Sequence, residues 1–339
     1  MIIALPACIE PLEVDTKQDN VRLVVNGIIT DAPGPHTIAL TQTQVFPYVP
    51  DKIPVVTGAT VVLADENGNT EQLLEEEPGV YLTSAAFRGI VGQTYSLFIN
   101  LPNGKKYTST PEKLVPVPNI DSLYYEVERR ITLDEEDKPR ESFWLNAFVN
   151  TRDMSNQKDY YKWEYEAIYQ VDTQPWLHQK LDARGNWIPD PLSCCKTCWI
   201  TQVNDIIRLQ SDQLLNGKNI NRQLVVRLPI NNQFFNSRLR LDVWQYSVSE
   251  GAYDYWNVVK TQVGSVGNIQ DPPPAFIKGN ISNITDPEEE VLGYFGVSAI
   301  VSKSIFISAG QLGIGLPPFE YANSCLELDN STTLKPVSW

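Results

Sequence analysis

The segment between residues 161 and 171 alternates apolar and polar side chains more strictly than the rest of the chain. Alternation with a period of two residues is typical of a β-strand, because successive side chains of a strand point to opposite faces. The segment therefore predicts a strand with one aromatic and one charged face. Its odd positions hold Tyr161, Trp163, Tyr165, Ala167, Tyr169 and Val171. Similar runs, which predict a mainly β second half, cover 143–149, 224–230, 239–243 and 295–301.

Short strand-like runs also follow one another between residues 21 and 115. The pairs Asn26-Gly27, Asn67-Gly68 and Asn103-Gly104 separate several of them, and such pairs favour tight hairpin turns. About seven strands in roughly 95 residues is the density of an immunoglobulin-like β-sandwich. The Cys, Trp, Cys pattern of true immunoglobulin domains does not occur here, so the similarity is one of architecture only.

A stiff connector follows these runs. Pro111, Pro116 and Pro118 each fix their own φ and bias the preceding residue away from helix. We therefore predict three parts. Residues 1–20 are a lipoprotein signal remnant with an acidic tether, residues 21–115 are the sandwich, and residues 119–339 form a larger β-rich domain.

One helix is predicted within this larger domain, near residues 248–262. Ser247-Val-Ser-Glu250 has the pattern of a capping box at a helix start. The apolar residues at helical spacing are Val248, Ala252, Tyr255, Trp256 and Val259. We interpret this aromatic stripe as a face packed in the core, and a ligand platform is the alternative.

The chain begins with an apolar stretch that ends at Cys8. Leu5, Ala7 and Cys8 match a lipobox, in which a small residue precedes the cysteine that receives a diacylglycerol. Pro6 and the lack of charges before Ile2 depart from the usual pattern. We predict lipid attachment at Cys8, and the alternative is a frayed terminus with one buried cysteine. No other stretch approaches the roughly 18 apolar residues of a spanning helix, so lipid would be the anchor.

Four further cysteines, Cys194, Cys195, Cys198 and Cys325, allow two disulfides with three connectivities in an extracytoplasmic protein. Because a bond between adjacent cysteines is strained, we favour one bond from Cys198 or a neighbour to Cys325 and one within the loop at 194–198. Zinc is the rival ligand. A structural zinc site needs four ligands at defined spacing, and the chain has only two histidines, so we predict no metal.

The charge balance excludes one broad class of function. The chain has 27 Lys and Arg against 41 Asp and Glu, a net charge of -14, which repels nucleic acids. A P-loop, a dinucleotide fingerprint, Gly-x-Ser-x-Gly and His-Glu-x-x-His are all missing. We interpret His36 and His178 as surface residues and the acidic runs at 75–77, 134–137 and 286–290 as solvated loop charge. A carboxylate-based glycoside hydrolase is the less favoured alternative.

Three tryptophans, Trp176, Trp187 and Trp199, lie near the cysteine loop in sequence. An exposed indole can hold a neutral ligand by stacking, so these residues are candidates for a ligand or partner surface. The alternative, which we favour for Trp199, is that it packs against the disulfides.

Several short motifs, taken together and in order, resemble those of one family. They are Cys8 with Glu10-Pro11, Leu23–Gly27, Gly58–Val61, Pro78–Tyr81, Gly92–Tyr95, Ile120–Leu123, Cys198-Trp199, Ala252–Trp256, Gly279–Ile281, Pro287–Phe295 and Lys335–Trp339. The chain thereby resembles the Bacteroidota outer-membrane lipoproteins catalogued as domain of unknown function 4249. The resemblance implies an outer-membrane lipoprotein, often encoded near TonB-dependent transporters, with an immunoglobulin-like N-terminal part and no established activity. Acidic residues just after Cys8 resemble the signal for cell-surface display in these bacteria, and a solvated linker is the alternative.

From these features we expect a non-enzymatic lipoprotein of the outer membrane, exposed at the cell surface and held by lipid at Cys8. It would bind a partner protein or a nutrient ligand, such as a glycan or a peptide, as an accessory to a TonB-dependent transporter. A structural or adhesive surface protein is the alternative. We expect no cofactor, no metal and no nucleic-acid partner.

Overall fold

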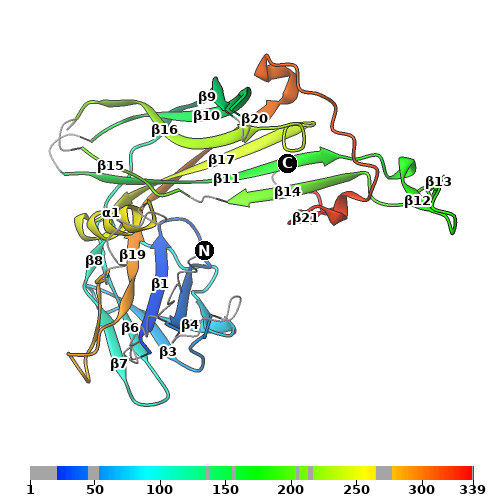
Figure 1. Ribbon diagram of the computed structural model, residues 1–339. Coiled ribbons are helices and arrows are strands. Elements are labelled where there is room, and N and C mark those ends of the chain that lie inside the picture. The colour runs from blue at the N-terminus through cyan, green and yellow to red at the C-terminus, as the bar shows by residue number, and fades with distance from the viewer. Residues whose placement is uncertain are drawn as a thin grey trace, which may run out of the picture.

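The computed structural model describes residues 21–44, 53–133, 137–154, 158–203, 206–212, 217–264, 277–337 and 339. Within these ranges the strands form two β-rich units, and one α-helix lies where the units meet (Figure 1). The prediction of a mainly β fold is confirmed. Cys8 and the acidic tether lie outside the described residues. In the ranges given above, no helix is long and apolar enough to cross a membrane.

The first unit, drawn at the bottom of Figure 1, is one hydrogen-bonded sheet that folds back on itself. The strands run in the order β18-β7-β6-β3-β4-β5-β2-β1-β19, and β8 pairs with β6. Their bounds are β1 (Leu23–Thr30), β2 (Thr37–Gln42), β3 (Thr60–Asp65), β4 (Thr70–Glu77), β5 (Val80–Leu82), β6 (Thr94–Asn100), β7 (Lys106–Ser109), β8 (Glu112–Lys113), β18 (Ile281–Asn283) and β19 (Leu292–Ser298).

Strand β4 lets this sheet form a sandwich. Its first half pairs with β3, with Leu73 opposite Val61, and its second half pairs with β5, with Leu74 opposite Leu82. The strand thereby passes from one layer to the other. Alternate residues of the strands point into the space between the layers, as the period of two predicts. Val25, Leu40, Leu63, Leu97 and Phe295 are among the side chains buried there.

The second unit packs a sheet in the order β16-β10-β9 against a sheet in the order β20-β17-β11-β14-β21, with β15 paired to β11. A separate hairpin, β12 with β13, projects from it (Figure 1). The bounds are β9 (Ile120–Leu133), β10 (Pro139–Arg152), β11 (Tyr160–Asp172), β12 (Gln179–Leu181), β13 (Trp187–Pro189), β14 (Thr197–Val203), β15 (Arg208–Ser211), β16 (Asn219–Ile230), β17 (Arg238–Val248), β20 (Ile300–Ser308) and β21 (Ser331–Thr332). The short 3₁₀ helices are η1 (Pro175–Leu177), η2 (Ala309–Leu312) and η3 (Cys325–Glu327).

The aromatic face of β11 forms the centre of this core, as predicted. Trp163 is fully buried, and its indole N–H donates to the side-chain oxygen of Gln245 on β17 at 2.9 Å. The Gln245 amide in turn donates to the carbonyl of Pro118 at 2.8 Å. This chain of hydrogen bonds satisfies buried polar groups and fastens the proline connector to the second unit.

The two units are not divided by a single point in the sequence. Strands β18 and β19, which lie inside the predicted second domain, belong to the first unit. β19 pairs in parallel with β1, and β18 pairs with β7. Ala299 alone separates β19 from β20 of the second unit. A local pattern identifies a strand but not its partner. The prediction from sequence therefore placed β18 and β19 in the wrong unit.

Helix α1 (Glu250–Gly264) is the predicted helix, but its cap differs from the prediction. Ser249, not Ser247, accepts a hydrogen bond from the N–H of Ala252 at 3.1 Å. Ser247 is the penultimate residue of β17, and its buried hydroxyl donates to the carbonyl of Val115 at 2.6 Å. The Ser247 hydroxyl also accepts a hydrogen bond from the N–H of Ala299, between β19 and β20, at 3.1 Å. The strand continues through the residue expected to cap the helix, because this hydroxyl is already bonded to the connector and to the junction of β19 with β20.

Candidate functional site

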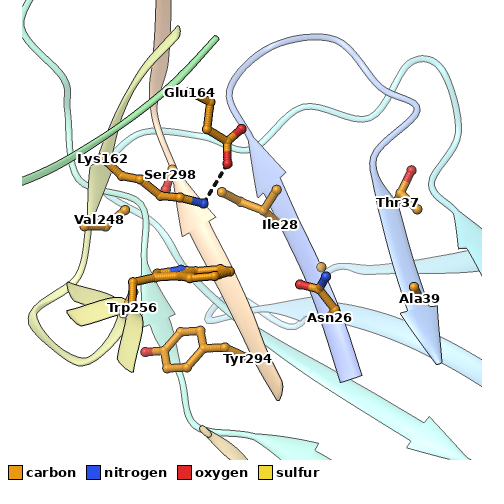
Figure 2. Close-up of a pocket in the computed structure, with 13 residues that line it drawn as sticks. Asn26, Ile28, Thr37, Ala39, Lys162, Glu164, Val248, Trp256, Tyr294 and Ser298 are labelled. Carbon is orange, nitrogen blue, oxygen red and sulfur yellow. Dashed lines mark hydrogen bonds and ion pairs between the residues drawn. The ribbon is translucent and has the colours of Figure 1, made fainter. Parts of the chain in front are cut away.

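A pocket of about 290 Å³ lies between the two units, beside helix α1 (Figure 2). Residues of β1, β2 and β19 form its first wall, and residues of β11, β17 and α1 form its second. We call it the junction pocket. Because each unit supplies one wall, the pocket depends on how the units dock and not on either unit alone.

The first wall is hollow because small side chains face outward there. Along β1, Val25 and Ile29 point into the sandwich core, so Asn26 and Ile28 point out into the pocket. The neighbouring strands contribute Ala39, Gly296 and Ser298, none of which carries a long side chain. These short side chains leave room beneath the second wall.

The second wall carries a charge pair against an indole ring. The ammonium of Lys162 donates to Glu164 Oε1 at 2.7 Å and lies 4.1 Å from the centroid of the Trp256 ring (Figure 2). Lys162 is only 8% exposed. The sequence predicted that this face of β11 is charged, but helix α1 covers this end of it. The carboxylate and the electron-rich ring face together compensate the buried positive charge.

Tyr294 joins the junction pocket to a second hollow of about 470 Å³ beside α1. Its hydroxyl donates to Glu112 Oε1 at 2.6 Å, and the Asn280 amide donates to the same oxygen at 3.3 Å. Burial, together with the hydrogen bond to Glu112, raises the pKa of Tyr294 well above its ordinary value. The phenol therefore stays protonated and acts as a fixed donor.

This arrangement is suited to binding. A mostly apolar hollow with a few fixed polar groups is the usual form of a small-ligand site. Its volume is close to the lower end of the range of about 300–1,000 Å³ for such sites, which suits one sugar ring or the end of a short peptide. The sequence drew attention to Trp256 through the aromatic stripe, and to Lys162 and Glu164 through the charged face. Nothing local connected these residues to Asn26, which lies more than a hundred residues from each of them, or to Gly296 on β19.

The three tryptophans proposed as a surface do not converge. Trp176 in η1 is 50% exposed and Trp187 in β13 is 66% exposed. Trp199 instead makes an edge contact with Trp339 at a centroid distance of 6.3 Å. Within the described ranges, no ring contact joins any two of the three. Trp199 neighbours Cys198 on β14, but adjacent strand residues face opposite sides, which is why its ring meets Trp339.

The projecting hairpin is an exposed apolar surface in its own right. Leu181 on β12 lies directly opposite Trp187 on β13, and both side chains are exposed. Leu177 of η1 and Ile188, the neighbour of Trp187 on β13, are exposed as well. We call the paired Leu181 and Trp187 the hairpin patch.

The four cysteines form two disulfides. Cys198 is joined to Cys325 of η3, and both are fully buried. Cys194 is joined to Cys195. The expected bond to Cys325 is thus made by Cys198, and the expected bond within the loop at 194–198 joins the adjacent pair that we disfavoured. Once β14 turns Cys198 inward to Cys325, Cys194 and Cys195 are the two cysteines of the described residues that remain to pair.

His36 is not the surface residue predicted from its turn sequence. It is only 8% exposed, and its ring makes an edge contact with Phe87. Burial lowers the pKa of His36 below its ordinary value. His178 is half-buried, and its Nδ1 atom lies 2.8 Å from the carbonyl oxygen of Asp190.

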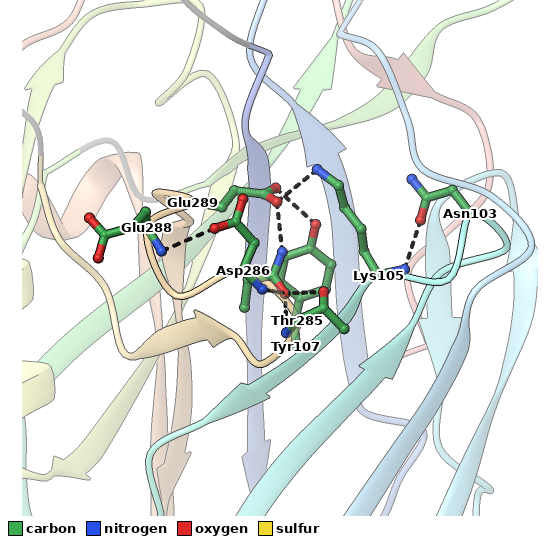
Figure 3. Close-up of polar contacts among 8 residues, drawn as sticks. Asn103, Lys105, Tyr107, Thr285, Asp286, Glu288 and Glu289 are labelled. Atoms are coloured by element: carbon green, nitrogen blue, oxygen red, sulfur yellow. Dashed lines mark hydrogen bonds and ion pairs between the residues drawn. The ribbon is translucent and has the colours of Figure 1, made fainter.

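One residue of the acidic run at 286–290 is also not solvated loop charge. Glu289 accepts hydrogen bonds from the Lys105 ammonium at 2.7 Å, the Tyr107 hydroxyl at 2.9 Å and the Asn283 amide at 2.6 Å (Figure 3). Burial alone would raise the pKa of Glu289, but these donors outweigh it and hold the pKa below its ordinary value. The carboxylate fixes the loop between β18 and β19 to β7, which no local pattern could reveal.

A family model described as "Domain of unknown function (DUF4249)" matches residues 9–304. A search of curated proteins found no match.

Proposed function

Since the chain belongs to the DUF4249 family, we propose that it is a lipid-anchored outer-membrane protein that binds a nutrient ligand in the junction pocket as an accessory to a TonB-dependent transporter. The anchor is the predicted lipid on Cys8, and the transporter is the partner that the family resemblance implies. The protein binds its ligand without transforming it.

The observation that carries the binding role is the second wall of the junction pocket. Lys162, Glu164 and Trp256 are held by one another, so their positions are set before a ligand enters. Preorganised groups lose little conformational entropy on binding. A polar ligand with an apolar edge, such as a sugar unit or a peptide end, fits this mixture of charge, amide and ring.

A ligand screen with a pocket-filling variant tests the binding role. Gly296 faces the pocket, and a Cβ there would have an ordinary contact, 3.6 Å, with Ile28 Cγ1. Gly296→Val should therefore fold while its methyl groups narrow the pocket. We expect a glycan or short peptide to bind the full-length protein and the variant to lose at least tenfold in affinity, roughly the effect of 1.4 kcal/mol. Gly310→Val, with no atom near its added Cβ, is the control. Equal binding by both variants would place the ligand elsewhere.

The hairpin patch favours a partner-protein role for a second surface. Exposed contiguous apolar surface is one of the features that mark protein-binding sites. Affinity purification of the lipidated protein from its native outer membrane, followed by mass spectrometry, should recover a β-barrel transporter in fixed ratio. A double variant, Leu181→Ser with Trp187→Ser, should no longer recover the transporter, whereas Gly296→Val should still recover it. Recovery of the lipoprotein alone would reject the accessory role and leave a free-standing ligand binder or an adhesive protein.

A further inference from the structure

Three buried aspartates from separate strand ends meet at one end of the second unit. Asp153 directly follows β10, Asp159 directly precedes β11, and Asp212 directly follows β15. Because Ser211 pairs with Tyr160, Asp212 and Asp159 continue the ladder, and the Asp212 N–H donates to the Asp159 carbonyl at 3.0 Å. Carboxylate oxygens of all three residues lie within 4.8 Å of one another.

These carboxylates are almost completely removed from solvent. Asp153 and Asp159 are each 4% exposed and Asp212 is 1% exposed. Within the described part of the chain, Oδ2 of Asp212 has no hydrogen-bond partner, and neither Asp153 nor Asp212 forms an ion pair with a lysine or arginine. Lys158, next to Asp159 in sequence, is directed to Glu250 at 3.8 Å. Burying several like charges together is strongly unfavourable unless a proton or a cation compensates them.

The hydrogen bonds around Asp153 fix the position of its carboxylate. The Tyr161 hydroxyl donates to Oδ1 at 2.6 Å, and the Gly217 N–H donates to Oδ2 at 2.8 Å. The two oxygens of a carboxylate have about four lone-pair sites, so each oxygen can accept a further contact. The carboxylate is therefore held beside the other two with acceptor sites left for a cation.

We propose that Asp153, Asp159 and Asp212 bind a calcium ion. The donor set consists of carboxylate oxygens, which hard cations prefer, and it lacks the nitrogen or sulfur ligands typical of zinc. Magnesium usually keeps several waters and takes one or two carboxylates, whereas calcium accepts a protein cage rich in carboxylates. This inference is independent of the ligand proposed for the junction pocket.

The site lies beside elements that shape that pocket. The hydroxyl of Tyr160, next to Asp159, donates to Glu250 in the first turn of α1 at 2.8 Å. β15 lies close to α1 in Figure 1. Bound calcium would therefore hold together three strand ends, and the start of the helix is bonded to one of them through Tyr160.

Calcium titration of the full-length protein after treatment with a chelator tests the proposal. Calorimetry should give one calcium site per chain, and calcium should raise the melting temperature more than the same concentration of magnesium, since an ion that binds only the folded state stabilises it. Asp212→Asn should lower calcium affinity by about tenfold or more because ligand charge sets affinity. Asp329→Asn, which removes one exposed carboxylate, is the matched control and should bind like the parent protein.

Melting temperatures of the parent protein and Asp212→Asn, measured with and without calcium, distinguish a calcium site from a cluster with only a structural role. Without calcium, Asp212→Asn should melt at a higher temperature than the parent protein, because the substitution removes like-charge repulsion. With calcium the order should reverse. No calcium binding by the parent protein, or an equal calcium response in Asp212→Asn, would overturn the proposal. If Asp212→Asn does not fold, the titration of the parent protein decides: a single saturable site supports the proposal, and no site rejects it.

Discussion

The ammonium of Lys162 lies 4.1 Å from the centroid of the Trp256 ring while it donates to Glu164 at 2.7 Å. One cation thereby joins a strand of the second unit to the helix that packs against the first. The contact also sets the second wall of the junction pocket. Its loss should affect both the stability of the protein and the shape of the pocket.

Lys162→Met tests this contact while keeping most of the side-chain stem. The substitution leaves the partly buried Glu164 without its cation, and we expect a loss of about 1–2 kcal/mol in the free energy of unfolding. Urea denaturation followed by tryptophan fluorescence measures it. Lys180→Met removes an exposed ammonium that pairs with Asp190, and the free energy of unfolding should change little. An equal effect of the two substitutions would show that the Trp256 contact stabilises nothing.

Glu289 should make stability depend on pH. The pKa of Glu289 is lower in the folded protein than in the unfolded chain, where it is about 4.3. Its contribution to the free energy of unfolding is therefore complete above the unfolded-state pKa, and it is lost as the pH falls through the folded-state pKa. Glu289→Gln should therefore be less stable than the parent protein at neutral pH, and the difference in the free energy of unfolding should shrink as the pH falls below the unfolded value. Denaturation curves at several pH values measure this difference. Glu288→Gln, which removes an exposed neighbouring carboxylate, is the control for the loss of one negative charge.

Gly293 should tolerate no side chain. Its φ is +88°, and a Cβ would overlap the carbonyl oxygen of Val25 on the paired strand β1. Gly293→Ala should lower the free energy of unfolding by about 3 kcal/mol or more, because the cost of the strained backbone adds to the cost of the steric overlap. Thermal unfolding measures the loss. Gly310→Ala has no atom near its Cβ and should melt close to the parent temperature, and a similar melting temperature for Gly293→Ala would contradict this account.

The two disulfides should contribute very differently to stability. The bond between Cys198 and Cys325 spans 127 residues. Closing a loop of that length lowers the entropy of the unfolded chain and stabilises the folded state by about 3–5 kcal/mol. Replacing both cysteines with alanine should lower the melting temperature strongly. The adjacent pair closes almost no loop, so Cys194→Ala with Cys195→Ala should have a small effect. Non-reducing thermal scans of the two double variants give the comparison, and equal losses would argue against loop length as the cause.

Local patterns predicted the elements of the fold well. The alternation at 161–171 became β11, and the aromatic stripe became α1, because side-chain period indicates which face packs against the rest of the protein. Within α1, Ala252 is buried, whereas Tyr255 and Trp256 are only partly buried. The cap of α1 was predicted two residues early, since Ser247 satisfies a contact between units that competes with capping. His36 was placed on the surface for a similar reason, because a turn sequence does not show that Phe87 packs over it.

The amino-acid sequence by itself determined the β class, the helix, the family and the residues able to form disulfides, because each rests on local periodicity or on short motifs. Only the tertiary structure decided which strands pair, and it returned β19 to the first unit beside β1. The same long-range packing brought Lys162 to Trp256 and gathered Asp153, Asp159 and Asp212 from three strand ends. Strand partners are chosen by burial and backbone hydrogen bonding across the whole chain, so sites assembled at strand ends leave no signal at any one place in the sequence.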